Sequence, residues 1–413
     1  MAVSKSEVAG NKAPIIVVGA GPVGLFQALS LYLKGIECVI LEKRSEAISD
    51  TRSLGIHPPC LVMLEELGLL SEFLKKGIRV DKGIAHNGRK RLGEINFSTT
   101  RQSGQKHPYI LIHPQNETEA ILKSAFTELS PNNIKYGYEV TSYRDNGDHL
   151  VVYSHKVPHS TENQLTETQE HRTPILIACD GKNSTLRSMA GIPYKGSPYP
   201  DSYAMGDFPD PEYPPSPPFV YITSEGLVES FPIADQKRRW VIKTEHYQSK
   251  PQPKWLSDAI YERVGERPNA DSCSMISSFG VQHHRAALRQ KNRLFLVGDA
   301  AHVVSPIGGQ GMNLGWLGAW QLAKDVKILY GKGVLYKPSE NPIPLTSYST
   351  NFDAVVTEVA RRAHWNMRMG RKSKLQWLKQ LFIQILLYIP VIEKTSRTVH
   401  NEQFANQIVL KPT

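Results

Sequence analysis

The chain has 413 residues, which is long enough for two domains and too long for one small core. Its 40% hydrophobic and 21% charged residues are typical of a folded globular protein and exclude a wholly disordered chain. Lysine and arginine exceed aspartate and glutamate, 49 against 39, which favours an anionic ligand, an acidic partner or a membrane surface. No nucleic-acid-binding module is recognisable, so nucleic acid is disfavoured as a partner.

The cysteines give no sign of a metal site. Cys38, Cys60, Cys179 and Cys273 form no C-x-x-C pair, and two of them lie in apolar runs. We therefore expect buried thiols in a reducing compartment, with neither disulfides nor a bound metal. Residues 1–13 lack the apolar segment of a secretion signal, so the sequence predicts a cytoplasmic protein.

A nucleotide-binding unit is predicted at residues 14–44. Residues 15–18 are apolar and β-branched, which predicts a buried parallel strand, and Gly19, Gly21 and Gly24 follow with the spacing G-x-G-x-x-G. Gly19 permits the tight turn, Gly21 leaves the backbone open to a pyrophosphate, and Gly24 lets the next helix pack closely. A second strand ends at Glu42, which we expect to accept hydrogen bonds from a ribose. An ordinary glycine turn is the weaker interpretation because all these parts agree.

Two polar residues near this unit have open roles. Arg52 lies in a polar loop after the second strand, where it can reach a phosphate or a flavin or be a solvated loop arginine. Gln115 precedes a predicted helix whose expected N-cap is Asn116, and it is either a ligand contact or a polar loop residue. The residues themselves do not decide between these roles.

Two later strands also end in acid and glycine pairs. Residues 175–179 lead into Asp180 and Gly181, and Arg187 lies in the helix that follows. Residues 294–297 lead into Gly298 and Asp299. Ligands of parallel sheets bind at such carboxyl ends, so we expect these residues near the nucleotide.

A glycine-rich loop at 306–313 stands between the last of these strands and an apolar helix. The helix opens with the amides of Gly311, Met312 and Asn313, and its positive end suits negative charge. A flexible linker is the alternative, but linkers do not usually join a buried strand to an apolar helix.

A second sheet is predicted from alternating apolar and polar residues at 78–107 and 191–285. Its aromatic residues can line a substrate pocket, although core packing is the more frequent role of such side chains. The candidates for substrate contact are Tyr203, Phe219, Tyr221 and Phe231.

The C-terminal part is helical in pattern. Residues 361–392 hold seven lysines or arginines and no acid, and they include an apolar stretch shorter than a membrane span. We favour a buried closing helix. A basic helix resting on anionic lipid is the alternative, and it would imply peripheral membrane contact and a lipophilic substrate.

Three motifs in this order resemble those of a known family. GAGPVG at 19–24, DGKNSTLR at 180–187 and GDAAHVVSPIGGQGMN at 298–313 are similar to those of the FAD-dependent aromatic hydroxylases, single-component flavoprotein monooxygenases of the para-hydroxybenzoate hydroxylase type. The resemblance covers residues 14 to 325. It departs at Gly318, where relatives commonly have an aspartate.

The resemblance implies roles for single residues. Arg44, Arg52 and Gln115 would contact FAD, Asp299 would bond the ribityl chain, and Pro306 would lie beside the flavin ring. The amides of residues 311–313 would bind the pyrimidine end of the ring. Pro306 and Arg52 are the expected catalytic residues. The expected FAD-binding residues are Gly19, Gly21, Pro22, Val23, Gly24, Glu42, Lys43, Arg44, Arg52, Gln115, Asp180, Gly181, Arg187, Gly298, Asp299, Pro306, Gly309, Gly311, Met312 and Asn313.

The predicted fold is α/β, with a Rossmann-type FAD-binding domain at 1–77, 108–190 and 286–325. An antiparallel-sheet substrate domain at 78–107 and 191–285 is inserted in it, and a helical segment follows at 326–413. The resemblance implies hydroxylation of an aromatic or phenolic substrate, polycyclic and prenylated ones included. The reaction would use O2, would take NADPH or NADH as a transient reductant, and would proceed through a flavin C4a-hydroperoxide.

Two alternatives to this function stay open from the sequence. One is a flavin-binding scaffold that holds a reactive intermediate with little redox chemistry. The other, a flavin-dependent halogenase, is disfavoured because the W-x-W-x-I-P motif is missing. The sequence predicts no oligomeric state.

Overall fold

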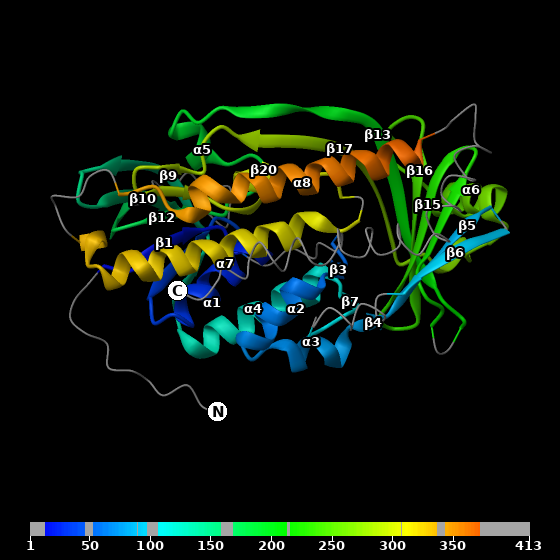
Figure 1. Cartoon of the computed structure of the whole chain (residues 1–413), viewed down its shortest axis with the longest axis horizontal. Coiled ribbons are helices and arrows are strands. Elements are labelled where there is room, and N and C mark those ends of the chain that lie inside the picture. The colour runs from blue at the N-terminus through cyan, green and yellow to red at the C-terminus, as the bar shows by residue number, and fades with distance from the viewer. Residues whose placement is uncertain are drawn as a thin grey trace.

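The computed structural model describes residues 13–45, 53–88, 90–96, 106–157, 168–212, 215–306, 308–336 and 343–371. Within these residues the strands form a six-stranded, an eight-stranded and two three-stranded sheets. Most of the eight-stranded sheet lies at one end of the long axis, and the six-stranded sheet lies toward the other (Figure 1). The α/β fold class predicted from the sequence is confirmed.

The six-stranded sheet contains the strands predicted around the first glycine motif. In order, they are β18 (Gln290–Lys291), β19 (Leu294–Leu296), β12 (Leu176–Ala178), β1 (Ile15–Val18), β2 (Cys38–Glu42) and β8 (Ile134–Tyr136). All neighbouring pairs are parallel except β18 with β19. Side chains alternate along a strand, so Ile15 and Val17 of β1 enter one core and Ile16 and Val18 another.

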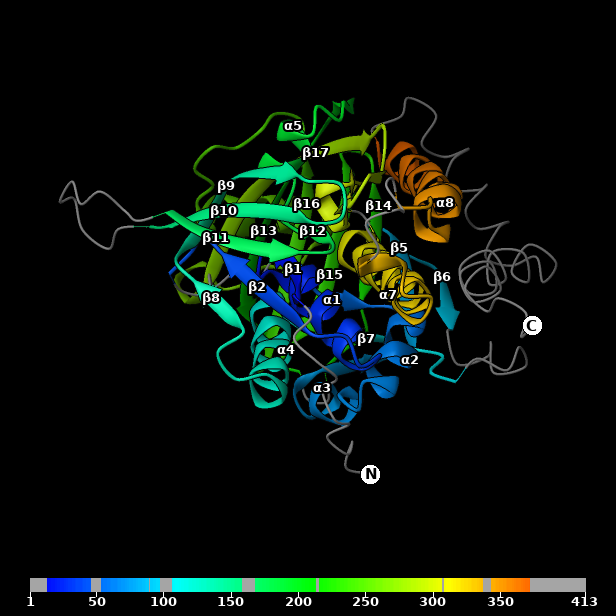
Figure 2. The ribbon, with the colours of Figure 1, turned by 90° about the vertical axis from the view of Figure 1, so that its left-hand side faces the viewer.

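Different layers cover the two faces of this sheet (Figure 2). The helices α1 (Pro22–Tyr32), α4 (Gln115–Leu129) and α7 (Gln310–Gly331) pack on the face that Ile15 enters. On the other face lie α5 (Thr185–Met189) and a three-stranded sheet of β11 (Thr168–Thr173), β10 (Leu150–Lys156) and β9 (Tyr138–Asp145). Both faces are therefore buried, as is usual for parallel strands.

Smaller elements complete this half of the molecule. The helices α2 (Pro58–Glu66) and α3 (Leu70–Lys76) lie next to a second three-stranded sheet of β3 (Gly55–Ile56), β7 (Ile110–Ile112) and β4 (Ile78–Val80). The 3-10 helix η4 (Val334–Tyr336) and the helix α8 (Ser347–Gly370) follow α7 along the chain.

The eight-stranded sheet confirms the expected antiparallel pattern, except that β14 and β5 are parallel. Its order is β20 (His302–Val303), β17 (Met275–Ala286), β13 (Tyr194–Pro209), β16 (Lys237–Thr244), β15 (Gly226–Ile233), β14 (Phe219–Thr223), β5 (Lys82–Asn87) and β6 (Lys90–Asn96). The helix α6 (Pro253–Val264) packs on one face, and the 3-10 helix η2 (Ala270–Ser272) follows it.

Two long strands connect the halves of the molecule. β13 has 16 residues and β17 has 12, and both run from the eight-stranded sheet toward the glycine motifs (Figure 1). β17 pairs there with β20, directly after the 3-10 helix η3 (Gly298–Ala300). The sheet and the loop around Asp299 are thus joined by backbone hydrogen bonds.

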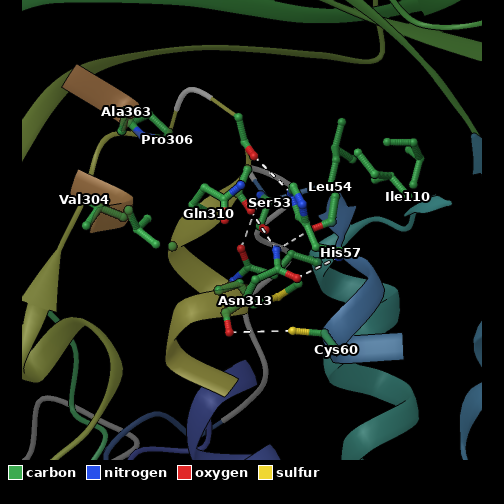
Figure 3. A pocket seen from close by; sticks show the side chains of 18 of the residues that line it. Ser53, Leu54, His57, Cys60, Ile110, Val304, Pro306, Gln310, Asn313 and Ala363 are labelled. Atoms are coloured by element: carbon green, nitrogen blue, oxygen red, sulfur yellow. Dashed lines mark hydrogen bonds between the residues drawn. The ribbon is translucent and has the colours of Figure 1, made fainter. Parts of the chain in front are cut away.

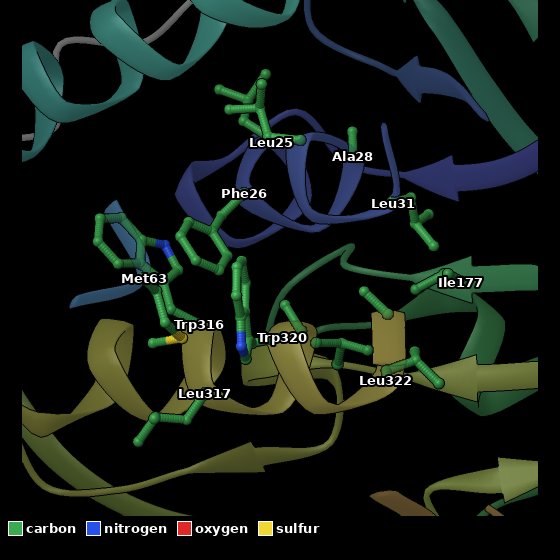
Figure 4. Close-up of a cluster of buried hydrophobic side chains, with 14 of the residues drawn as sticks. Leu25, Phe26, Ala28, Leu31, Met63, Ile177, Trp316, Leu317, Trp320 and Leu322 are labelled. Carbon is green, nitrogen blue, oxygen red and sulfur yellow. The ribbon is translucent and has the colours of Figure 1, made fainter. Parts of the chain in front are cut away.

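Aromatic packing holds α1 against α7 (Figure 4). The rings of Phe26 and Trp316 stack with centroids 4.7 Å apart and planes 8° apart, and Trp320 lies 6.2 Å from Phe26. The indole nitrogen of Trp316 donates to the carbonyl of Pro22, 3.0 Å away. Because Pro22 is the first residue of α1, this bond ties α7 to the glycine turn.

Gly318, where the chain departs from the family motif, is a packing position. A Cβ at Gly318 would lie 3.0 Å from the ring carbon Cε2 of Tyr348 and 3.3 Å from Phe352, both in α8. Glycine therefore allows α8 to lie directly on α7. Asp325 stabilises the same contact, since it accepts hydrogen bonds from the amide of Tyr348 and the hydroxyl of Ser347, at 2.6 and 2.8 Å.

One predicted boundary is wrong. The helix α4 begins at Gln115 with Pro114 at the N-cap, and Asn116 lies inside its first turn. Proline suits that place because its fixed φ allows the chain to enter the helix. The apolar part of the predicted C-terminal helix, at 375–390, lies outside the described residues. No helix among those that the structure describes is long and apolar enough to cross a membrane.

Candidate active site

A cavity of about 940 Å³ is lined by both halves of the molecule. One wall comes from the start of α1, residues 53–60 and the loop from Asp299 to Asn313. The other comes from the eight-stranded sheet and α8. This volume lies in the usual range for cavities that hold cofactors or small ligands.

The helices α1 and α7 both begin at the first wall. α1 has Gly21 at its N-cap and α7 has Gly309, and neither helix has a side-chain cap that would satisfy its first amides. Unsatisfied amides at a helix start attract negative charge and carbonyl oxygens. A Cβ at Gly21 or Gly311 would meet no atom within 4 Å, so open space lies over both backbones. This wall therefore fits a diphosphate and the polar edge of a flavin.

The other glycines of the motifs shape the turns. A Cβ at Gly19 would lie 2.5 Å from the carbonyl oxygen of Cys179, and one at Gly24 would lie 1.9 Å from that of Gly19. Gly298 packs on Val23 with a φ of +62°. These three positions allow β1, α1 and β19 to approach one another but do not line the cavity.

Glu42 is already hydrogen-bonded within the protein. Its carboxylate accepts from the amide of Ala20 at 2.6 Å and from the amide and Nε of Arg44 at 2.9 and 2.8 Å. Burial alone would raise its pKa, but the bonds from Arg44 and Ala20 outweigh this and lower the pKa. Glu42, Lys43 and Arg44 do not line the cavity, and Lys43 is exposed.

Asp180 and Asp299 differ in exposure. Asp180 is half-buried, accepts a hydrogen bond from the amide of Leu186 at 3.2 Å, and has a pKa raised by burial. It does not line the cavity, whereas the neighbouring Gly181 does. The side chain of Asp299 is exposed at the cavity wall, and its backbone carbonyl accepts a hydrogen bond from the hydroxyl of Tyr194.

Arg187 does not line the cavity. Its guanidinium donates to the carbonyls of Ala300 and Lys182, at 3.0 and 2.9 Å, and lies 3.7 Å from the ring centre of Tyr194. These contacts hold the loop after β12 against η3, so the residue positions both loops. Arg52, an expected catalytic and FAD-binding residue, lies outside the described residues.

Asn313 connects α7 to the segment before α2 (Figure 3). Its amide nitrogen donates to the carbonyls of Gly55 and Gly309, both at 2.7 Å, and its Oδ1 accepts from the amide of His57 at 2.8 Å. The ring of His57 bonds the carbonyl of Gly308, 3.0 Å away. The side chain thereby fixes the loop that carries the first amides of α7. The sequence carried no signal for His57.

The expected FAD-binding residues thus divide into two groups. Those that line the cavity are Gly21, Pro22, Val23, Gln115, Gly181, Asp299, Pro306, Gly309, Gly311, Met312 and Asn313. Those that the structure describes but that do not line it are Gly19, Gly24, Glu42, Lys43, Arg44, Asp180, Arg187 and Gly298. Gln115 donates to the carboxylate of Glu119, 2.9 Å away, which orients its amide group.

Four aromatic residues were expected to line the substrate pocket, and for three of them this prediction is wrong. Phe231 lines the cavity. Phe219 and Tyr221 of β14 belong to the core beneath α6, on the opposite face of the sheet. Tyr203 is on the cavity face but is covered, since it is 1% exposed and stacks on Phe279 with ring centres 5.5 Å apart. Alternation along the strands explains this, because Val220 between the two β14 aromatics faces the cavity.

The sheet wall is mainly apolar and holds charged residues that sequence reasoning missed. Its apolar residues include Ile84, Met205, Val220, Phe231, Val241 and Phe279. The charged ones are Glu229, Arg239 and, from α8, Arg362. Arg239 forms a two-bonded ion pair with Asp207, at 2.7 and 2.8 Å. No motif contains these residues, so only the fold brings them together.

Known proteins resemble this chain in sequence and in fold. The family model described as FAD binding domain matches residues 12–363. Rifampicin monooxygenase of Streptomyces venezuelae is 28% identical over 342 residues, which are 80% of this chain and 68% of that protein. The structure of p-nitrophenol 4-monooxygenase from Pseudomonas putida has a TM-score of 0.83 at 20% identity and covers 97% of this chain and 99% of that one.

A third structure, a Diels-Alderase of pyrroindomycin biosynthesis, has a TM-score of 0.73 at 20% identity, over 94% of this chain and 80% of that one. The chain belongs to the FAD binding domain family, and the resemblance to the FAD-dependent aromatic hydroxylases is confirmed. Within this family, the chain is similar to flavoproteins of the monooxygenase class.

Proposed function

We propose that this chain hydroxylates a phenolic aromatic substrate with O2, and that it takes its electrons from NADPH or NADH. The observation that carries the proposal is the shared cavity, in which open helix starts face the apolar side of the eight-stranded sheet. When bound, FAD supplies the redox chemistry and the transfer of oxygen. The proposal includes the route that the family resemblance implies, in which oxygen would reach the substrate through a flavin C4a-hydroperoxide.

Residues of the first wall would hold the cofactor. The amides at the start of α1 suit the diphosphate, and those of Gly311, Met312 and Asn313 suit the pyrimidine edge of the flavin. Asp299 offers a carboxylate to the ribityl hydroxyls, and Pro306 offers an apolar surface to the ring. We also propose the domain division expected from the sequence. Residues 1–77, 108–190 and 286–325 would bind FAD, and residues 78–107 and 191–285 would bind the substrate.

The sheet wall would hold the substrate. Val220, Val241 and Phe231 give flat apolar surface, which binds an aromatic ring and excludes water. The compounds in the names of two similar proteins, rifampicin and p-nitrophenol, both contain an aromatic ring, which supports an aromatic substrate here. The net charge of +10 is compatible with NADPH as a transient reductant at the surface.

A scaffold without redox turnover is the second candidate, because one neighbour of the same fold is described as a Diels-Alderase. The visible spectrum of the FAD-loaded protein separates the two functions. In a hydroxylase, NADPH should bleach the flavin in the absence of oxygen, and one phenol of a panel should make this reduction faster. The flavin should regain its colour when air is admitted. A flavin that neither NADPH nor NADH reduces with any phenol would contradict the hydroxylase.

A further inference from the structure

Glu229 is placed in the middle of the apolar cavity wall. It lies on β15, where its register partners are Val220 on β14 and Val241 on β16, and both valines also line the cavity. Phe231, two residues along the same strand, faces the same way. The carboxyl group is therefore surrounded by hydrophobic side chains on the face that receives the substrate under the proposed function.

The carboxyl group of Glu229 has no hydrogen-bond or ion-pair partner among the described residues. The two arginines that line the cavity within the described part of the chain bind other acids. Arg239 is held by Asp207 at 2.7 Å, and Arg362 by Glu358 at 2.6 Å. Glu229 is half-buried, and a carboxyl group that faces apolar side chains without a partner is poorly solvated, so a ligand that supplies the missing donor would stabilise it in this position.

The groups around Glu229 leave it as the available base of this wall. Among the residues that the structure describes, the charged ones that line the cavity are Lys182, Glu229, Arg239, Asp299 and Arg362, with His57 near the glycine loop. The pKa of Tyr203 on β13 is raised mainly by burial and then by the nearby charge of Glu229. Asp201 also raises this pKa, and Arg371 lowers it. β5, β14 and β17 bring no charged side chain to the cavity.

We propose that Glu229 recognises a hydroxyl group on the aromatic ring of the substrate and accepts its proton, which makes it a catalytic residue. The inference rests on the proposed function. In this step the phenolic O–H bond breaks, its electron pair stays on the oxygen, and the proton binds a carboxylate oxygen, with no change in oxidation state. The resulting phenolate is richer in electrons and reacts more readily with an electrophilic oxygen.

The protonation behaviour of the group suits this role. Burial raises the pKa of Glu229 to about 7. A base with a pKa near the working pH combines an adequate ionised fraction with good proton affinity. The active form is the ionised one, so activity should rise with pH through this value and level off above it.

The test compares the FAD-loaded wild type with Glu229→Gln and Glu229→Asp, using phenols of different acidity and the methyl ether of each. Binding is followed by the change in the visible flavin spectrum, and kcat/KM is measured across the neutral pH range. The wild type should bind each phenol about tenfold more tightly than its ether. Its rise in kcat/KM should stay near pH 7 whichever phenol is used.

Glu229→Gln should lose the rise with pH, lower kcat about a hundredfold and reduce the preference for phenols. Glu229→Asp should recover part of the pH dependence, part of kcat and part of the preference for phenols. Glu245→Gln, the same substitution at an exposed residue after β16, should match the wild type. Flavin content and Tm are measured for each variant so that loss of folding is recognised.

The two proposals fail in different ways. If the wild type hydroxylates phenols and Glu229→Gln keeps the pH profile and the preference, the role of Glu229 is overturned while the function stands. If the wild type hydroxylates no phenol, the proposed function fails, and the catalytic role of Glu229 fails with it. A wild type that binds phenols and ethers equally overturns the recognition of the hydroxyl group.

Discussion

At the scale of single residues, the acids of the first wall differ in what they can offer a ligand. Glu42 accepts hydrogen bonds from Ala20 and Arg44, and the half-buried Asp180 accepts one from the amide of Leu186 and does not line the cavity. Asp299 alone among these three has an exposed side chain at the cavity. Its carboxylate is therefore the one best placed to bond a hydroxyl-bearing chain.

Asp299→Ala should weaken FAD binding about tenfold or more, because a hydrogen bond to a charged group is lost, while the fold is kept. The measurement is the flavin retained after desalting, together with Tm. Asp271→Ala, at an exposed acid in η2, is the matched control. Unchanged flavin content in Asp299→Ala would contradict the assigned contact.

The sequence predicted residues at the strand ends better than residues on the sheet face. Asp299 and Gly181 follow buried strands, and any parallel sheet brings such ends together. The face of β14 was not readable, because Phe219, Val220 and Tyr221 are all apolar and a shift of one residue exchanges the two sides. Glu229 escaped notice because an acid in a strand usually indicates the solvent side.

At the scale of elements, the turn from β1 into α1 uses its glycines for two different purposes. Gly19 has a φ of +104° and no room for a Cβ, whereas Gly21 has a φ of −73° and open space beside it. The backbone conformation requires a glycine at position 19, whereas only a bound ligand would require one at position 21. Substitution should separate these requirements.

Gly19→Ala should lower the free energy of unfolding by about 3 kcal/mol, because a strained backbone and a contact with Cys179 are added. Gly21→Val should change it by no more than about 1 kcal/mol and weaken FAD binding about tenfold or more, because the side chain enters the diphosphate space. Chemical denaturation and flavin retention measure the two effects. Normal FAD binding by Gly21→Val would show that the diphosphate lies elsewhere.

The contact between α7 and α8 accounts for the departure from the family motif. Gly318→Asp should lower the free energy of unfolding by about 3 kcal/mol, since a charged side chain would be pressed against Tyr348. Gly331→Asp, at the exposed end of the same helix, should cost at most about 1 kcal/mol. Equal effects of the two substitutions in denaturation curves would contradict this packing role.

The helix α8 itself shows what the sequence left undecided. A helical C-terminal part was predicted, but the contact with α7 depends on Gly318, Tyr348 and Phe352, which are far apart in the chain. No local pattern reports such a contact. The same holds for Asn313, whose bonds to Gly55 and His57 cross more than 250 residues.

At the scale of the whole molecule, the cavity exists because β13 and β17 carry the eight-stranded sheet back to the glycine motifs. The cofactor wall comes from short motifs that the sequence displays. The substrate wall comes from side chains spread over the strands of the sheet and α8, whose only common property is their place in the fold. This arrangement makes oxygen transfer between a bound flavin and an aromatic ring the central expectation.

The most direct measurement of that expectation is turnover of the FAD-loaded chain with NADPH, a panel of phenols and isotopically labelled dioxygen. Mass spectrometry of the products then shows whether labelled oxygen has been added to a ring. At least one phenol should become heavier by one labelled oxygen atom, in amounts matched to the NADPH consumed. NADPH oxidation that yields only labelled hydrogen peroxide, or no NADPH oxidation with any phenol, would contradict the account.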